Sequence, residues 1–168
     1  MWRTVLVGST LVAIVVMLAA RAGSQSTMNV DETIAWMKNY LDNHGTTLVQ
    51  AKRREDDGSL SVSGRETYCA SIRESNQCTL KIHLGCANDP PRYQADGSLN
   101  LKLFDPTSAK VTTYLDGQWF GTLGNAVEVQ TSNATGVQKF PIDSSESAGH
   151  FAKALSHAID LCGGKSAF

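Results

Sequence analysis

The sequence predicts an α+β fold, with an antiparallel curved sheet or partly open barrel of seven to eight strands. An N-terminal amphipathic helix precedes the sheet and a C-terminal capping helix follows it. Three observations support this fold class. Residues 30–44 and 144–162 carry apolar side chains at helical spacing, and residues 46–142 alternate with a period of two. Turn residues interrupt the alternating region at short intervals, which favours antiparallel pairing over crossover connections.

The first 22 residues have the pattern of a signal peptide. Arg3 precedes an apolar run from Val5 to Ala20, and Ala20 and Ala22 form a small-x-small cleavage triplet around Arg21. The alternative is an uncleaved membrane anchor, although the run is shorter than the about 20 apolar residues that a spanning helix needs. We therefore expect a secreted or periplasmic protein, which contacts a membrane only if this segment is retained.

Cleavage leaves residues 23–168, the size of a single extracytoplasmic domain. Removing 22 of 168 residues leaves 146, and losing Arg3 and Arg21 changes 15 basic residues to 13 against 16 acidic ones, a formal charge of −3. A net negative charge indicates no general attraction for nucleic acid or anionic lipid.

Both helices carry end signals. Asn29 is the expected N-cap of the opening helix, with Glu32 at the capping-box position, and Gly45 is the expected stop. The closing helix is expected to start at the N-cap Asp143, with Glu146 three residues on. Its apolar stripe includes Phe151, Leu155 and Cys162 and faces the sheet.

Short alternating segments are the expected strands. They are "TTLVQAKRR", "SLSVSG", "ETYCASIR", "CTLKIHLGC", "SLNLKLF", "AKVTTYL", "QWFGTL", "AVEVQT" and "VQKFPI". In "SLNLKLF" the core face carries Leu99, Leu101 and Leu103. In "CTLKIHLGC" it carries Cys78 and Cys86, with His83 on the outer face.

The four cysteines, Cys69, Cys78, Cys86 and Cys162, all lie in the exported part, where two disulfides are expected. Their spacing does not match a zinc site. Because Cys162 faces the core, it is expected to bridge a core-facing strand cysteine, either Cys78 or Cys86. Cys69 points outward by parity, which argues against a Cys69–Cys86 bridge and leaves Cys69 a candidate free thiol.

Several passages resemble a group of uncharacterised exported bacterial proteins. They are "LNLKLFDPTSAKV", "CTLKI", the tryptophan-bearing opening helix and the ending "ALSHAIDLCGGKSAF" with its LCGG motif. The resemblance covers most of the exported chain and implies a β-barrel-like domain between two helices. It also implies a Cys78–Cys162 disulfide, with Cys69 and Cys86 as additional cysteines.

Seven antiparallel strands followed by one helix are also the layout of the pleckstrin-homology superfold, an analogy that carries no function. A lipid-headgroup site would need a basic loop between the first two strands. The sequence there is "KRREDDG", in which basic and acidic charges largely cancel. No specific headgroup binding is expected.

Recognisable catalytic motifs are absent from the sequence: it has no G-x-S-x-G, no H-E-x-x-H and no glycine-rich phosphate loop. No cofactor or metal is expected. His150 and His157, with Asp160 nearby, are expected to be solvated polar positions, and a metal or acid–base role for them is the alternative.

The residues "DGQWFGTLG" contain the candidate partner-binding side chains. Trp119 and Phe120 are adjacent in a strand and point to opposite faces, so one ring is expected in the core and the other outside. An outward aromatic ring would contact a partner. The competing expectation is that the opening helix, with Trp36 and Tyr40, covers that outer face.

The leading functional prediction is an extracytoplasmic binding or interaction module for an unknown protein or small molecule. The alternative is a small secreted, hydrolase-like enzyme using loop residues 86–97. A pocket that combines two or more of Asp89, Arg92, Tyr93 and Asp96 with a histidine would favour the enzyme. A structural subunit of an envelope assembly is a third prediction.

Overall fold

The computed structural model describes residues 28–115 and 118–166. The expected signal peptide, residues 1–22, lies outside the described residues. In chain order the elements are α2 (Val30–His44), β1 (Thr46–Arg54), β2 (Leu60–Asn76), β3 (Thr79–Leu84), β4 (Ala95–Asn100), β5 (Lys110–Thr113), β6 (Trp119–Thr122), β7 (Asn125–Gln130), β8 (Val137–Ile142) and α3 (Ser145–Leu161). Short 3-10 helices lie at Pro91–Tyr93, Leu101–Leu103 and Pro106–Ser108. The fold is α+β, as predicted.

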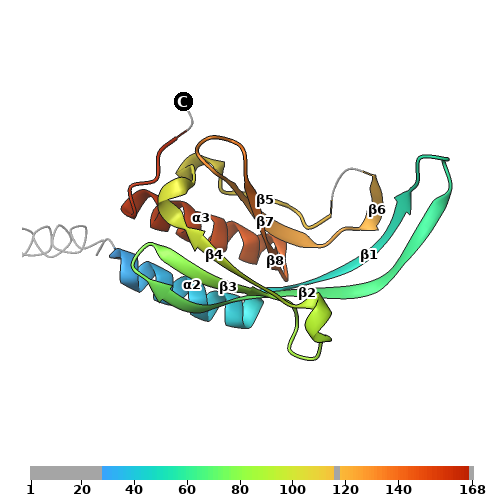
Figure 1. Ribbon diagram of the computed structural model, residues 1–168, viewed down its shortest axis with the longest axis horizontal. Helices are drawn as coiled ribbons and strands as arrows, with labels where there is room; N and C mark the ends of the chain where they lie inside the picture. Colours follow the sequence, from blue (N-terminus) through green and yellow to red (C-terminus); the bar gives the residue numbers. More distant parts are fainter. Residues whose placement is uncertain (1–27, 116–117, 167–168) are drawn as a thin grey trace, which may run out of the picture.

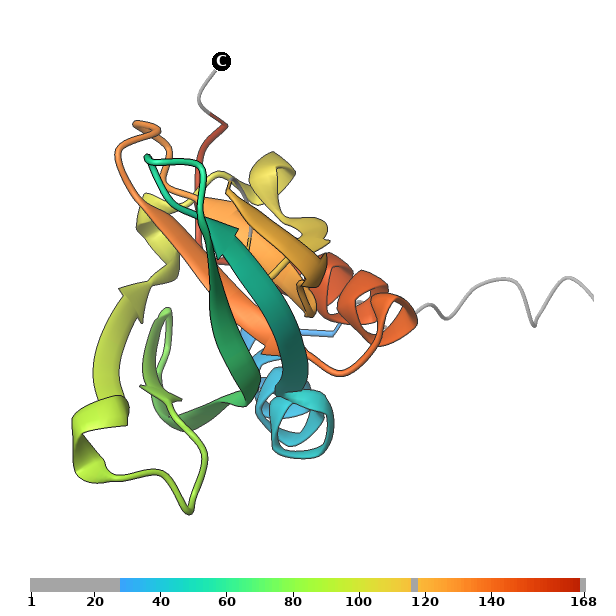
Figure 2. The same cartoon turned by 90° about the vertical axis from the view of Figure 1, so that its right-hand side faces the viewer.

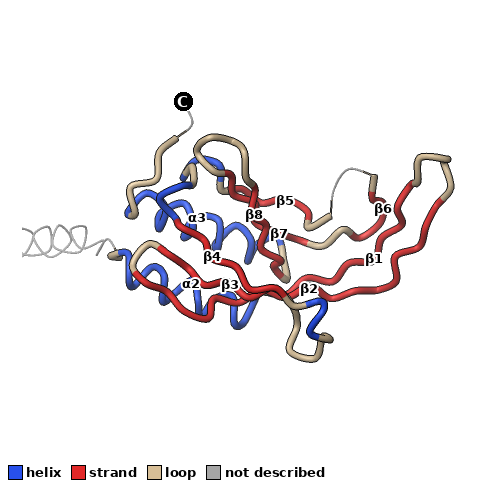
Figure 3. Tube along the Cα trace, in the orientation of Figure 1, coloured by secondary structure: helices blue, strands red, loops and turns tan. Residues whose placement is uncertain are grey.

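The strands form two antiparallel sheets (Figure 1, Figure 3). The five-stranded sheet has the order β4-β3-β2-β1-β6, and the three-stranded sheet has the order β5-β7-β8. Helix α2 packs on β2 and on α3, and α3 packs on β5, β7 and β8. The two helices therefore lie side by side, and Figure 2 views them along the long axis of Figure 1.

Helix α2 begins and ends at the predicted residues. The Asn29 side chain accepts a hydrogen bond from the Glu32 backbone N–H, and the Glu32 carboxylate accepts one from the Asn29 backbone N–H, both at 3.0 Å. This capping box satisfies backbone donors that the first helical turn cannot satisfy itself. At the other end, the N–H of the C-cap residue Gly45 donates to the Leu41 carbonyl oxygen at 2.7 Å.

Helix α3 has a different cap from the predicted one. The N-cap is Ser144, whose side chain accepts a hydrogen bond from the Ser147 backbone N–H at 3.1 Å. The Asp143 carboxylate instead lies 2.7 Å from His44 Nδ1 and connects the end of α2 to the start of α3. Aspartate and serine are about equally good N-caps, so local preference did not distinguish them.

The core lies between the helices and the inner faces of both sheets. Met37 of α2, Phe140 of β8, and Phe151 and Leu155 of α3 are fully buried in it. The Phe140 and Phe151 rings meet edge to face, with their centroids 5.3 Å apart. The stripe predicted for the closing helix is thus the buried face of α3.

Two strand predictions are wrong. "SLSVSG" and "ETYCASIR" are one 17-residue strand, β2, because residues 63 and 64 together oppose Ala51 as a bulge and do not form a turn. "SLNLKLF" stops being a strand at Asn100, whose side chain accepts a hydrogen bond from the Lys102 N–H at 3.1 Å. The 3-10 helix that follows leaves Leu103 exposed instead of core-facing.

Two disulfides join Cys78 to Cys162 and Cys69 to Cys86. The first pair is the one that the family resemblance implied. The prediction that Cys86 faces the core is wrong, because Gly85 has a φ of +124° and ends the alternation of β3. Cys86 therefore meets the outward-facing Cys69, and no described cysteine is free. Two disulfides fit a chain that folds outside the cytoplasm.

Glu128 on β7 is a buried carboxylate between two cations. Lys110 Nζ on β5 lies 3.2 Å from one carboxylate oxygen, and Lys139 Nζ on β8 lies 3.6 Å from the other. Burial raises the pKa of Glu128, but the hydrogen bonds from Lys110 and Gln130 together with the charges of both lysines outweigh it, so the pKa lies below 4.5. The ion pairs therefore link all three strands of the smaller sheet.

Candidate binding site

The five-stranded sheet extends beyond the core as an arm (Figure 1, Figure 3). We define the arm as residues 50–54 of β1, 60–66 of β2 and 119–122 of β6. Alternate side chains of β1 are buried as far as Ala51, whereas Lys52, Arg53 and Arg54 are all exposed. In Figure 1 the tip of the arm lies at the end of the molecule opposite the start of α2. The arm is thus a projecting piece of sheet with little core beneath it.

One face of the arm combines basic and apolar side chains, and we call it the basic face. The strand register places Val62 opposite Lys52 and Leu60 opposite Arg54, and Phe120 pairs with Lys52 from the other side. Directly opposed residues of antiparallel strands share a face of the sheet. Leu60, Val62 and Phe120 are 53, 74 and 46% exposed, so no described element covers them.

A shallow hollow of about 590 Å³ lies in the basic face and is lined by Gln50, Lys52, Val62, Arg65 and Phe120, among others. The Arg54 guanidinium lies 5.1 Å from the Phe120 ring centroid, a cation–π contact. Lys52, Arg54 and Arg65 form no salt bridge with any residue in the described part of the chain. The hollow therefore has cations around an apolar surface.

The acidic residues that follow Arg54 in the sequence belong to the turn at the tip. The Glu55 carboxylate accepts a hydrogen bond from the Ser61 hydroxyl at 2.6 Å. The Asp57 carboxylate accepts one from the Ser59 backbone N–H at 2.9 Å, and the hydrogen bonds from Ser59 lower the pKa of Asp57. These two carboxylates are held within the turn at the tip, whereas Lys52, Arg54 and Arg65 lie along the strands of the arm.

A second hollow, of about 880 Å³, opens where β3 leaves β2, and we call it the cleft. Strand β3 pairs with β2 only between Ala70 and Asn76. Beyond that point the Gly85 N–H donates to the Cys69 carbonyl oxygen at 2.9 Å, and the chain turns away. The residues that line the cleft include Arg65, Thr67, Tyr68, Cys86, Asp89 and Tyr114. The cleft thus follows the edge of β2 beside the Cys69–Cys86 disulfide.

Tyr68 and Tyr114 form an aromatic wall of the cleft, with ring centroids 4.5 Å apart. Burial raises the pKa of both phenols, and a 2.6 Å hydrogen bond from Tyr68 to the Glu66 carboxylate raises the pKa of Tyr68 further. Both tyrosines are therefore protonated at neutral pH. The Asp89 carboxylate accepts a hydrogen bond from the Cys86 N–H at 2.7 Å. The carboxylates of Glu66 and Asp89 both accept hydrogen bonds within the cleft.

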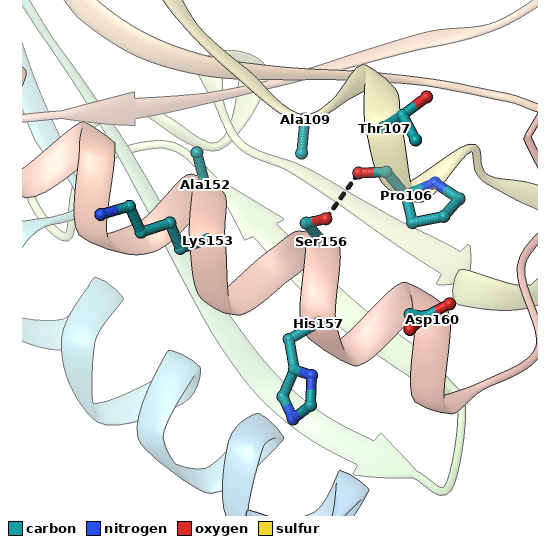
Figure 4. A pocket seen from close by; sticks show the side chains of 8 residues that line it. All are labelled: Pro106, Thr107, Ala109, Ala152, Lys153, Ser156, His157 and Asp160. Atoms are coloured by element: carbon teal, nitrogen blue, oxygen red, sulfur yellow. Dashed lines mark hydrogen bonds between the residues drawn. The ribbon is translucent and has the colours of Figure 1, made fainter. Parts of the chain in front are cut away.

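A third hollow, of about 560 Å³, lies between α3 and the 3-10 helix at Pro106–Ser108 (Figure 4). It contains Ser156, His157 and Asp160, three residue types that hydrolases use together. Their side chains point apart in Figure 4. The Ser156 hydroxyl donates to the Pro106 carbonyl oxygen at 2.6 Å, and His157 Nε2 lies 3.3 Å from the Met28 carbonyl oxygen. These three residues do not form a catalytic triad.

The predicted partner-binding residues both lie on the arm. Phe120 belongs to the basic face, whereas Trp119 lies on the opposite face, half-buried, with the Arg53 guanidinium 6.0 Å from its ring centroid. The prediction that one of these rings enters the core is wrong, because β6 pairs with β1 beyond the core. The expectation that the opening helix covers the outer ring is also wrong, since α2 packs mainly on β2 and α3.

The loop residues predicted for an enzyme site are separated. Asp89 lies in the cleft, whereas Asp96 lies on β4 with its carboxylate 2.8 Å from His83 Nδ1. The hydrogen bond from His83 is the main cause of the lowered pKa of Asp96. His83 is buried, although alternation predicted an outward position. Arg92 is exposed, and the side chain of Tyr93 is outside the described part.

Sequence reasoning missed Arg65, Tyr68 and Tyr114 as site residues. Arg65 and Tyr68 lie in an ordinary alternating strand, and Tyr114 follows β5 in a bend. The two tyrosines meet only through the fold, because β5 belongs to the other sheet. No local pattern could have indicated this contact.

Residues 28–115 and 118–166 contain no group of three or more histidine, cysteine or acidic residues placed to hold a metal ion. No helix in these ranges is both long and apolar enough to cross a membrane. Comparison of the chain with protein-family models, curated proteins and solved structures found no match.

Proposed function

We propose that the chain is an extracytoplasmic binding module and that it binds an acidic partner protein through the basic face of the arm. The observation that supports this most directly is the pairing of Lys52 and Arg54 with the exposed residues Val62, Leu60 and Phe120 on one face. Core packing does not account for these apolar side chains. Exposed apolar groups next to arginine and aromatic residues are typical of protein interfaces.

A protein partner fits the basic face better than a small ligand. The hollow there is shallow and open, and it is lined by long side chains, whereas small-molecule sites are enclosed and bury most of their ligand. Lys52, Arg54 and Arg65, which have no salt bridge within the described residues, attract an acidic surface to the arm, and the apolar side chains then exclude water from the contact.

A charge-reversal experiment tests the proposal with poly-L-glutamate as the acidic probe. Residues 23–168 bind the probe at low salt, and binding weakens as the ionic strength rises. The double variant Lys52→Glu/Arg54→Glu binds about tenfold more weakly, because two exposed charge contacts of up to about 1 kcal/mol each are reversed. The matched control is Lys102→Glu/Lys153→Glu, which changes the net charge equally at two exposed positions off the arm and keeps the affinity within twofold.

Two results would contradict the proposal. An equal loss of affinity for poly-L-glutamate in the arm variant and in the control would show that binding depends only on net charge. Binding to phosphatidylglycerol vesicles but not to poly-L-glutamate would show that the basic face recognises a membrane surface instead of a protein.

A further inference from the structure

One edge of β2 is open along the arm. Strand β2 pairs with β1 from Leu60 to Cys69, but it pairs with β3 only from Ala70 to Asn76. Within the described ranges, residues 60–68 therefore have a neighbouring strand on one side only. An open edge presents a row of backbone donors and acceptors that can pair with an extended chain.

The backbone groups of Arg65 and Thr67 point toward this open edge. The Cys69 carbonyl oxygen accepts a hydrogen bond from the Gly85 N–H on the β3 side of the strand. Since successive residues direct their backbone groups to opposite edges, Thr67 and Arg65 share the side of Cys69. The Thr67 carbonyl oxygen contacts the Cys86 sulfur at 3.5 Å. Within the described ranges, the Thr67 N–H and the Arg65 N–H and C=O have no backbone partner on this side.

The cleft lies along this edge of β2. Arg65, Thr67 and Tyr68 line it from β2, and Cys86 and Asp89 line it from the loop after β3. An added strand lies about 4.8 Å from its neighbour. Such a strand would continue the line of β3 past the point where the chain turns away.

The side chains around the cleft indicate the chemistry of the added strand. Arg65 is exposed, has no salt bridge within the described part and lines both the cleft and the basic face. Tyr68 and Tyr114 lie on the other face, since Tyr68 is in register with the buried Thr47. An extended segment would thus place carboxylates next to Arg65 on one face and apolar side chains against the tyrosines on the other.

We propose that the open edge of β2 in the cleft binds an extended segment of the partner protein, with alternating acidic and apolar residues, as an added β-strand. This inference rests on the proposed function and specifies how the partner is held. The backbone pairs with Arg65 and Thr67 and supplies affinity, and the alternating side chains supply specificity.

Amide hydrogen exchange of residues 23–168 tests the inference. The probe is an acetylated eight-residue peptide of alternating glutamate and valine. Bound peptide slows exchange at the Arg65 and Thr67 amides at least tenfold, because these N–H groups become ladder donors. The same peptide with lysine in place of glutamate gives no protection. N-methylation of those peptide residues whose N–H groups face β2 also abolishes the protection, because it removes the donors that pair with this edge.

A variant pair tests the role of the Arg65 side chain. Arg65→Glu weakens glutamate–valine peptide binding about tenfold, as expected for a reversed cross-strand ion pair. Lys102→Glu, at an exposed position distant from the cleft in sequence, leaves the affinity unchanged within twofold. Equal effects of the two variants would refute the proposed contact.

Other outcomes separate this inference from the proposed function. If poly-L-glutamate binds the arm while the peptide leaves both amides unprotected, the added strand is refuted and the proposed function stands. If the amides of the free protein are protected in a concentration-dependent way, and sedimentation shows dimers, the edge pairs with a second copy and the partner segment is refuted.

Discussion

Removing the Cys78–Cys162 disulfide should destabilise the fold more than removing the Cys69–Cys86 disulfide. The two bridges close loops with sequence separations of 84 and 17 residues. In the chain-entropy treatment a bridge stabilises the fold by restricting the unfolded chain, and the gain grows with the logarithm of loop length. This relation gives about 4.6 kcal/mol for the longer loop and about 3.1 kcal/mol for the shorter one, a difference of about 1.4 kcal/mol.

Double alanine variants provide the comparison. Cys78→Ala/Cys162→Ala and Cys69→Ala/Cys86→Ala each remove two sulfur atoms and bury no new hydroxyl group, so the two variants are matched in chemistry. Urea unfolding followed by tryptophan fluorescence measures the free energy of unfolding of each variant and of the parent chain. Cys162 is 6% exposed and packs in the core, so its loss adds a small cavity cost in the same direction.

This reasoning would be refuted if Cys69→Ala/Cys86→Ala lowered the free energy of unfolding as much as Cys78→Ala/Cys162→Ala, or more. Peptide mapping under non-reducing conditions is the accompanying check. A free thiol on Cys162 in the parent chain would remove the bridge on which the calculation depends.

Two further predictions concern the fold that holds the site. Glu128→Gln should cost about 1–2 kcal/mol at pH 7, because Lys110 and Lys139 lose their shared carboxylate. The pKa of Glu128 is lowered from 4.5. The stability that the Glu128 carboxylate contributes is therefore present above that pH and is lost as the pH falls through the folded-state pKa. Urea midpoints of parent and variant should therefore converge in acid, and a constant gap would contradict the ion pairs. Gly45→Ala should cost about 1–3 kcal/mol, because a Cβ there overlaps carbonyl oxygens of α2 and β2. The control Gly149→Ala has open space in α3 and should stabilise by about 0.5–1 kcal/mol in thermal unfolding, and equal effects of the two changes would contradict this account.

Capping residues and hydrophobic periodicity correctly predicted those parts of the fold that depend on residues close together in the sequence. Helix α2 matches its predicted range because Asn29, Glu32 and Gly45 act within one or two turns of their own positions. Strand β1 matches "TTLVQAKRR" because its alternation extends to Ala51 before the chain leaves the core. The α+β class follows from these two periodicities.

Predictions failed where a single residue ended a pattern. Gly85 turned Cys86 to the outer side and so allowed the bridge to Cys69, which strict alternation had argued against. Asn100 ended a strand by accepting a hydrogen bond from the Lys102 N–H, although its apolar alternation continued. A period-two pattern does not report such local backbone changes.

The sequence alone determined the secondary-structure class, the ends of the opening helix and the amphipathic face of the closing one, because those depend on residues within a few positions of each other. Only the tertiary structure decided the candidate site. The arm exists because β1, β2 and β6 pair beyond the core, and the cleft exists because β3 separates from β2 after the register ends at Ala70 and Leu84. Strand pairing across long separations depends on which edges meet in three dimensions, and short-range patterns in a single chain contain no record of that.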